Sequence, residues 1–165
     1  GLSTDIIVGF PNEGEAQFMK THDLLAELRL DVAHLAMYSP RPHTAASRRM
    51  EENVPPEEKL RRLKALDALQ ENISLDINAA LVGQTLPVLV ENKHGDKWRG
   101  RTPTNKLVFF ADGDQDWKGY VVDVTIQRAS AWSMQGRDNG QGDNERTTRG
   151  HAAARDHSVD GVKAE

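Results

Sequence analysis

A run of basic, hydroxyl and aromatic residues, WRGRTPTNKLVFF, lies between Trp98 and Phe110. Lysine and arginine neutralise phosphates, and threonine and asparagine form neutral hydrogen bonds to the same oxygens. We predict that an RNA backbone is held by Lys97, Arg99, Arg101, Thr102, Thr104, Asn105 and Lys106. Each charge taken alone is better explained as ordinary charge on an exposed edge strand. Their combination on one small β-domain favours nucleic-acid binding.

The aromatic residues of this run have two alternative roles. Phe109 and Phe110 are consecutive, so in a regular strand they point to opposite faces. One of them then belongs to the core, and at most one is available to a base. Trp98 and Trp132 could either stack on bases or fill the core, and the sequence leaves that open.

A second candidate site lies at the ends of two apolar runs. Gly9 and Pro11 close the first run, and the carboxyl ends of parallel strands are where α/β folds bind ligands. A packing glycine followed by a turn proline explains the same residues equally well. Arg41 stands between two prolines at the corresponding end of the next strand. It is either an anion contact or an ordinary surface arginine.

The chain contains no cysteine, so it offers no thiolate nucleophile, disulfide or iron–sulfur ligand. Its histidines show no ligand spacing; they are His22, His34, His43, His94, His151 and His157. Neither a nucleophile elbow nor a glycine-rich phosphate loop is present. We therefore predict that the chain holds no metal and no catalytic residue of its own.

Charge and hydropathy limit the classes of partner. The net charge is −4, yet residues 93–106 carry five basic side chains against one acidic side chain, Asp96. The basic character is therefore local, as expected of a docking face. No apolar run approaches the ~20 residues that span a bilayer, and no leader peptide is visible. We expect a cytoplasmic protein with no membrane partner.

The first third of the sequence predicts a strand–helix–strand unit over Thr4–Phe10, Gly14–Leu30 and Val32–Tyr38. Two parallel strands leave open edges, and the chain starts at Gly1 rather than methionine. We therefore expect a fragment of a larger α/β sheet or barrel. Pro55 and Pro56 then begin a leucine-rich helix that reaches about Asn78, which we interpret as a connector packed on the preceding domain.

The rest of the chain predicts a small β-barrel of five short strands, with turns that include Asp112-Gly113 and Lys118-Gly119. The expected strands are Thr85–Glu91, Trp98–Thr102, Lys106–Phe110, Tyr120–Gln127 and Trp132–Gln135. Almost no large apolar residue follows, so we predict a disordered tail. The expected division is a barrel piece at 1–54, a connecting helix at 55–80, the β-barrel at 81–136 and the tail at 137–165.

Three segments, LSTDIIVGFP, YSPRP and GRTPTNKLVFF, resemble in this order the C-terminal half of the MiaB-type tRNA methylthiotransferases. The resemblance implies an α/β plus all-β fold class. The first part would be the last strand–helix–strand unit of a radical S-adenosylmethionine (SAM) barrel, which is a partial TIM-like barrel. The second part would be an OB-like TRAM domain. The resemblance also implies a parent enzyme that adds a 2-methylthio group to N6-isopentenyladenosine beside the anticodon. Asp5, Arg41, Pro42 and the TPTNK run favour that substrate.

The resemblance assigns expected roles to individual residues. The turns near the SAM pocket are Gly9, Phe10 and Pro11, and Tyr38, Ser39 and Pro40; Arg41 lies in the substrate loop. Residues from Arg101 to Lys106 would face the tRNA anticodon stem-loop. The family commonly has glycine where this chain has Asn12 and His43, and proline where it has Ala45. Both loop geometries therefore depend on how those residues are accommodated.

The resemblance also defines the cofactors of the parent enzyme: SAM and two [4Fe-4S] clusters, whose cysteine ligands this chain lacks. The chain alone is therefore expected to be inactive, monomeric and bound to tRNA rather than DNA. The alternative is a stand-alone RNA-binding module without catalysis. An upstream C-x-x-x-C-x-x-C motif in the gene would favour the enzyme.

Overall fold

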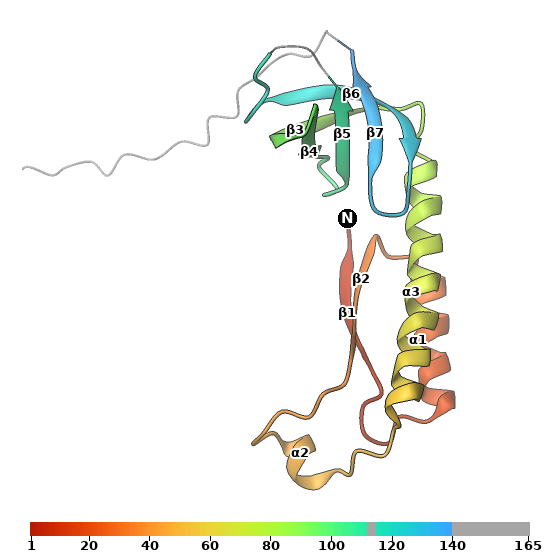
Figure 1. The fold of residues 1–165 in the computed structure, drawn as a ribbon. Helices are drawn as coiled ribbons and strands as arrows, with labels where there is room; N and C mark the ends of the chain where they lie inside the picture. The colour runs from red at the N-terminus through yellow and green to blue at the C-terminus, as the bar shows by residue number, and fades with distance from the viewer. Residues whose placement is uncertain (112–114, 140–165) are drawn as a thin grey trace, which may run out of the picture.

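The computed structural model describes residues 1–111 and 115–139, and shows two bodies joined by one long helix (Figure 1). The first body is the strand pair β1 (Ser3–Val8) and β2 (Val32–Met37) with helix α1 (Glu15–Leu28) between them in sequence. The second is a closed β-barrel. The predicted fold class, an α/β piece followed by an all-β barrel, is confirmed.

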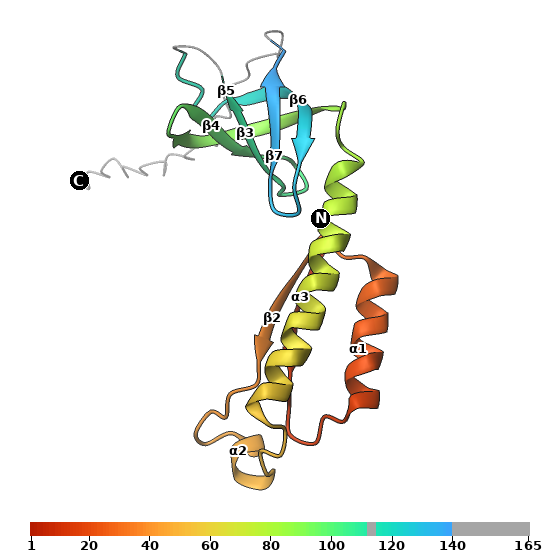
Figure 2. The ribbon, with the colours of Figure 1, turned by 45° about the vertical axis from the view of Figure 1, so that its right-hand side comes forward.

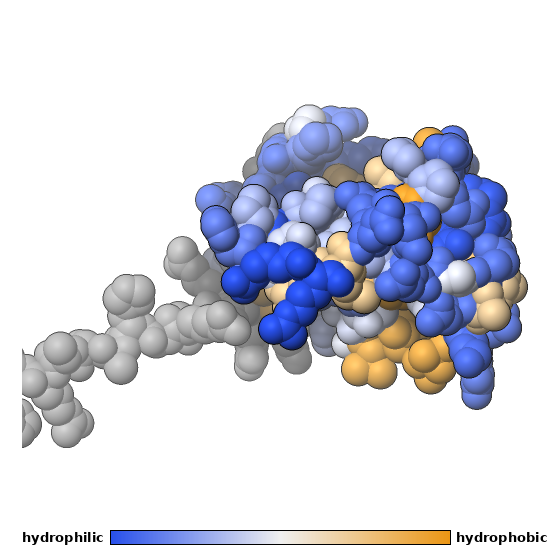
Figure 3. Space-filling model, turned by 90° about the horizontal axis from the view of Figure 1, so that it is seen from below, coloured by the Kyte–Doolittle hydropathy of each residue, from blue (hydrophilic) through white to orange (hydrophobic). Residues whose placement is uncertain are grey.

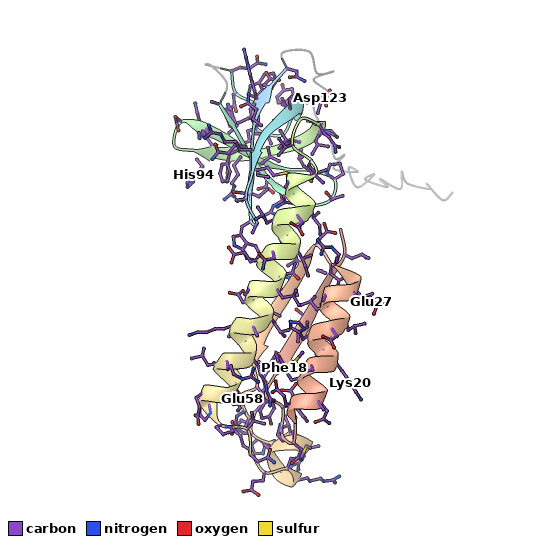
Figure 4. All side chains as sticks on the ribbon, turned by 90° about the vertical axis from the view of Figure 1, so that its right-hand side faces the viewer. Phe18, Lys20, Glu27, Glu58, His94 and Asp123 are labelled. Atoms are coloured by element: carbon purple, nitrogen blue, oxygen red, sulfur yellow. The ribbon has the colours of Figure 1, made fainter. Side chains whose placement is uncertain are left out.

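The strands β1 and β2 are parallel and pair in register from Ser3 with Val32 to Val8 with Met37. One face of this pair is covered by helices: Val8 packs with Phe18, which lies between α1 and α3 (Figure 4). The opposite face is open, and Ile7 on it is 58% exposed. Among the described residues, this small sheet is therefore covered on one side only.

Helix α3 (Pro56–Ala79) begins directly after Pro55, where a proline at the first helical position removes no helical hydrogen bond. Leu66 and Ile73 on its inner face complete the core under β1 and β2. The helix then extends to the barrel, so one element contacts both bodies (Figure 2). This agrees with the predicted connector.

The barrel contains β3 (Thr85–His94), β4 (Lys97–Arg101), β5 (Leu107–Ala111), β6 (Val121–Ala129) and β7 (Met134–Asp138). Its strand order is β3-β4-β5-β7-β6, and an antiparallel pairing of β3 with β6 closes it. Valines, Trp98 and Phe110 fill the interior. Gly100 of β4 faces inward, where an added Cβ would collide with the backbone of Leu89.

The structure differs from the sequence expectations at several strand ends and by one additional helix. Strand β3 runs to His94, beyond the expected end at Glu91. Strand β7 ends at Asp138, two residues beyond the predicted barrel boundary, because Arg137 and Asp138 pair with β6 although neither is apolar. A short helix α2 (Ala45–Arg49), capped by the Thr44 side chain, lies in the loop after β2. The Asp112-Gly113 turn and residues 140–165 of the predicted tail lie outside the described residues.

Candidate nucleic-acid interface and strand-end loops

The outer surface of β4 presents the basic residues of the motif. Burial alternates along the strand, with Trp98 and Gly100 inside the barrel. Because side chains alternate across a strand, Lys97, Arg99 and Arg101 lie on the outer face. The first three predicted RNA contacts are therefore brought together on one accessible surface.

Pairing across the sheet places an aromatic residue beside these cations. Arg99 is opposite Phe109 of β5, and Phe109 is opposite Gln135 of β7. The Phe109 ring also lies 6.0 Å from the ring of His94. Arg137 of β7 is exposed, as Gln135 is. We call this surface the basic sheet face; it consists of Lys97, Arg99, Arg101, Phe109, Gln135 and Arg137.

The alternative roles of the aromatic residues are now resolved. Phe110 is 1% exposed inside the barrel, whereas Phe109 faces outward. Trp98 is a core residue, and its ring is covered by the Lys93 ammonium 5.3 Å from the ring centre. Trp132 is exposed in the turn between β6 and β7.

One carboxylate moderates the charge of the basic sheet face. Glu91 lies 3.6 Å from Arg99 Nη2 and 3.4 Å from Arg101 Nε. These pairs are partly exposed and long, so each contributes little to stability. Both arginine side chains remain partly exposed beside it, at 36% for Arg99 and 40% for Arg101.

The TPTNK turn is braced from within. The Thr102 N–H donates to the Lys106 carbonyl at 3.0 Å, and the Lys106 N–H donates to the Thr102 hydroxyl at 3.1 Å. Arg101 Nη1 donates to the Asn105 carbonyl, and Asn105 has a positive φ of 65°. Thr102 is buried, and its hydroxyl lies 3.1 Å from that of Thr104. The threonines therefore shape the turn.

Lys106 does not share the outer surface of β4. Its Nζ lies 2.7 Å from Asp31 Oδ1, just before β2 in the other body. This hydrogen bond and the accompanying positive charge lower the pKa of Asp31 below its ordinary value. Lys106 thus lies in a cavity between the two bodies, which Arg101 also lines and Lys97 and Arg99 do not.

The second candidate site lies at the carboxyl ends of β1 and β2. The Tyr38 N–H donates to the Val8 carbonyl at 2.8 Å, and the rings of Phe10 and Tyr38 meet edge to face 5.0 Å apart. Gly9 has a φ of +74°, and the Lys59 side chain of α3 occupies the space of a Cβ. Gly9 is therefore both a turn glycine and a packing glycine.

Two buried cations of α3 hold these loops. The Lys59 ammonium donates to the Tyr38 carbonyl at 3.2 Å and pairs with Glu52. Arg62 donates to both the carboxylate and the carbonyl of Glu13 at 2.8 Å. Glu13 in turn accepts the Gly9 N–H. The sequence analysis did not predict these contacts. Charged residues on the apolar face of the predicted helix were the feature of the sequence that indicated them.

The residues that stand where the family has glycine both adopt left-handed conformations, with φ of 67° at Asn12 and 70° at His43. Asn12 gains a compensating partner, because its N–H and its side chain both hydrogen-bond the Asn53 side chain. Both loops therefore keep a left-handed backbone conformation, which glycine adopts readily.

The remaining predicted loop residues differ in exposure. Ser39, Pro40 and Arg41 are exposed, while Pro11 is buried. Seen from below, the end of the molecule that carries α2 is largely hydrophilic with smaller hydrophobic patches (Figure 3). The barrel lies at the opposite end, beside the amino ends of β1 and β2 (Figure 1). The basic sheet face and the strand-end loops are thus separated by the length of the strand pair.

Within the described residues, no three His, Asp or Glu side chains are grouped as metal ligands would be. No helix among them is long and apolar enough to cross a membrane.

Comparison with known proteins identifies residues 79–137 as a TRAM domain. Over 136 residues, 82% of this chain, it is 45% identical to a tRNA-2-methylthio-N(6)-dimethylallyladenosine synthase of Dehalococcoides mccartyi, of which it covers 32%. Proteins of the same name from Roseiflexus and Moorella thermoacetica are 47% and 48% identical over 138 residues, with 29% and 31% of their lengths covered. The chain therefore spans about a third of the length of these curated relatives.

Proposed function

Since this chain is a homologue of the MiaB-type tRNA methylthiotransferases, we propose that it forms the tRNA-binding part of such an enzyme. The proposed partner is the anticodon stem-loop. The proposed reaction of the whole enzyme is the addition of a 2-methylthio group to N6-isopentenyladenosine beside the anticodon. The proposal is supported by the cited relatives, which are named tRNA-2-methylthio-N(6)-dimethylallyladenosine synthases.

The observation that carries the proposal is the basic sheet face. Lys97, Arg99 and Arg101 form one row of cations beside the Phe109 ring. Cations that track a phosphate backbone next to an aromatic platform for bases are the usual means of binding single-stranded RNA. Arg137 extends the same surface onto β7.

Of the cofactors that the family implies, the iron–sulfur clusters do not fit the residues of this chain. Clusters are held by cysteine thiolates, and the sequence has none. Any cluster of the enzyme would have to be bound by residues outside this sequence.

S-adenosylmethionine does fit the strand-end loops. Phe10 is 42% exposed and forms an aromatic corner with Tyr38, where an adenine ring could pack. When bound, SAM would supply the methyl group of the reaction. The contribution of this chain would be to hold the two loops in place through Lys59 and Arg62.

A stand-alone RNA-binding module is the alternative function. The two-stranded sheet of β1 and β2 favours the enzyme. Ile7 is exposed on its open face, and its strand edges are unpaired among the described residues, as expected if a larger sheet or barrel continues from them. The gene decides between the two. A contiguous upstream sequence encoding C-x-x-x-C-x-x-C supports the enzyme, and an intact gene without it favours the module.

RNA binding is tested by titrating the chain with an anticodon stem-loop at several salt concentrations. Arg99→Ala should weaken binding and reduce the slope of log K against log salt by about one unit, because one phosphate contact is lost. Lys20→Ala on the exposed side of α1 is the matched control and should leave the slope unchanged. Equal slopes for wild type and Arg99→Ala would contradict the proposed interface.

A further inference from the structure

Lys106 belongs to the basic motif in sequence but is engaged elsewhere in the structure. Its ammonium lies 2.7 Å from the Asp31 carboxylate, and the two side chains are 12% and 25% exposed. The arginines of the basic sheet face are more exposed, at 36% for Arg99 and 40% for Arg101. Lys106 is therefore the least accessible of these three cations, and the one with a close carboxylate partner.

Asp31 is held firmly on its own side of this contact. Its second carboxylate oxygen accepts the Leu2 N–H at 3.0 Å. Its carbonyl accepts hydrogen bonds at 3.4 Å from two buried side chains of α3, Gln70 and Ser74. The carboxylate that receives Lys106 thus belongs to the rigid junction of β1, β2 and α3.

The barrel meets that junction at a second point. Asn78, near the end of α3, donates to the carbonyls of Ser130 and Ala131 in the turn between β6 and β7. One contact point would allow the barrel to pivot on the end of the helix. A second, in another connecting segment of the barrel, restricts that pivoting.

We infer that Lys106 is a positioning residue, which orients the TRAM barrel on the β1–β2 sheet by its ion pair with Asp31 and does not bind phosphate. The Lys106 side chain is only 12% exposed, so little of its ammonium is open to a phosphate while it pairs with Asp31. If Lys106 left Asp31, that partly buried carboxylate would be unpaired. The orientation matters because the basic sheet face and the strand-end loops lie at opposite ends of the sheet (Figure 1). In this respect the inference rests on the proposed function.

Two identical substitutions within the motif separate the two roles. Lys97→Met removes an outward cation and should lower the salt slope of stem-loop binding by about one unit. Lys106→Met should leave the slope unchanged. A drop of one unit in Lys106→Met would overturn the inference while the interface stands. An unchanged slope in Lys97→Met would count against Lys97 as an RNA contact. The role of Lys106 would then be decided by the spin-label distances described next.

The positioning role has its own measurement, which needs no RNA. Because the chain has no cysteine, Glu27→Cys on the outer side of α1 (Figure 4) and Asn92→Cys on β3 can carry a pair of spin labels. The distance distribution should be narrow with Lys106 present. It should broaden in Lys106→Met and equally in Asp31→Asn, which breaks the pair from the other side. Unchanged distributions in both variants would overturn the inference.

Discussion

Arg62 of α3 donates to the Glu13 carboxylate at 2.8 Å, and the two side chains are only 5% and 14% exposed. Glu13 also accepts the Gly9 N–H, so this pair fastens the loop after β1 to the helix that supports the sheet. A carboxylate in such a setting is stable only while its cation is present.

Arg62→Ala should therefore destabilise the chain by about 3–5 kcal/mol, because it leaves the Glu13 carboxylate buried and unpaired. The measurement is urea unfolding followed by circular dichroism. Arg61→Ala is the matched control, since the neighbouring guanidinium is 49% exposed and should change stability little. Comparable losses in the two variants would refute a special role for the buried pair.

Stability should fall only slightly in acid between about pH 4.5 and pH 2, because the pair mainly responsible, Arg61 with Glu58, is partly exposed and contributes little. The Arg61 guanidinium, assisted by Arg62, lowers the pKa of Glu58 from 4.5 to about 2. A carboxylate whose folded pKa is lowered contributes stability above its unfolded pKa and loses it as pH falls through the folded one. The lowered pKa of Asp31 acts in the same direction. The unfolding midpoint of the wild type should decline from pH 7 to pH 4 and pH 2.5, and the midpoint of Glu58→Gln should decline less. If the midpoints of both proteins fall in parallel, Glu58 is not a source of the acid sensitivity.

Phe109→Ala and Phe110→Ala should have opposite consequences. Phe110 is 1% exposed inside the barrel, so its truncation should cost about 3–5 kcal/mol of stability. Phe109→Ala should preserve the fold and weaken stem-loop binding by about 1–3 kcal/mol, the range for a stacked base. Thermal unfolding and RNA titration of both variants check this. Undiminished RNA affinity in Phe109→Ala would remove the aromatic platform from the proposed interface.

His43→Gly should be tolerated and His43→Val should not. His43 has a φ of 70°, a conformation that glycine adopts freely and a β-branched residue resists. We expect His43→Val to be about 1–2 kcal/mol less stable than His43→Gly. Chemical denaturation compares the two directly, and equal stabilities would mean that the loop adjusts its backbone.

Much of the fold follows from local patterns in the sequence. The continuous apolar run before Gly9 and the alternation Val122, Val124, Ile126 each indicate a strand, and the proline pair at 55–56 marks the start of α3. These elements rest on periodicity and backbone chemistry, which neighbouring residues determine. The far end of β7 was different, because Arg137 is strand through long-range pairing with Ala111 of β5 and Thr125 of β6.

The sequence by itself also determined the absence of thiolates and the local concentration of positive charge, because both depend on residue types alone. Only the tertiary structure decided which cations share a surface. Arg99 and Lys106 are seven residues apart in one motif. Strand pairing places Arg99 beside Phe109, whereas a contact between the two bodies places Lys106 against Asp31. Sequence spacing fixes the face of a strand, but long-range contacts fix what each side chain meets.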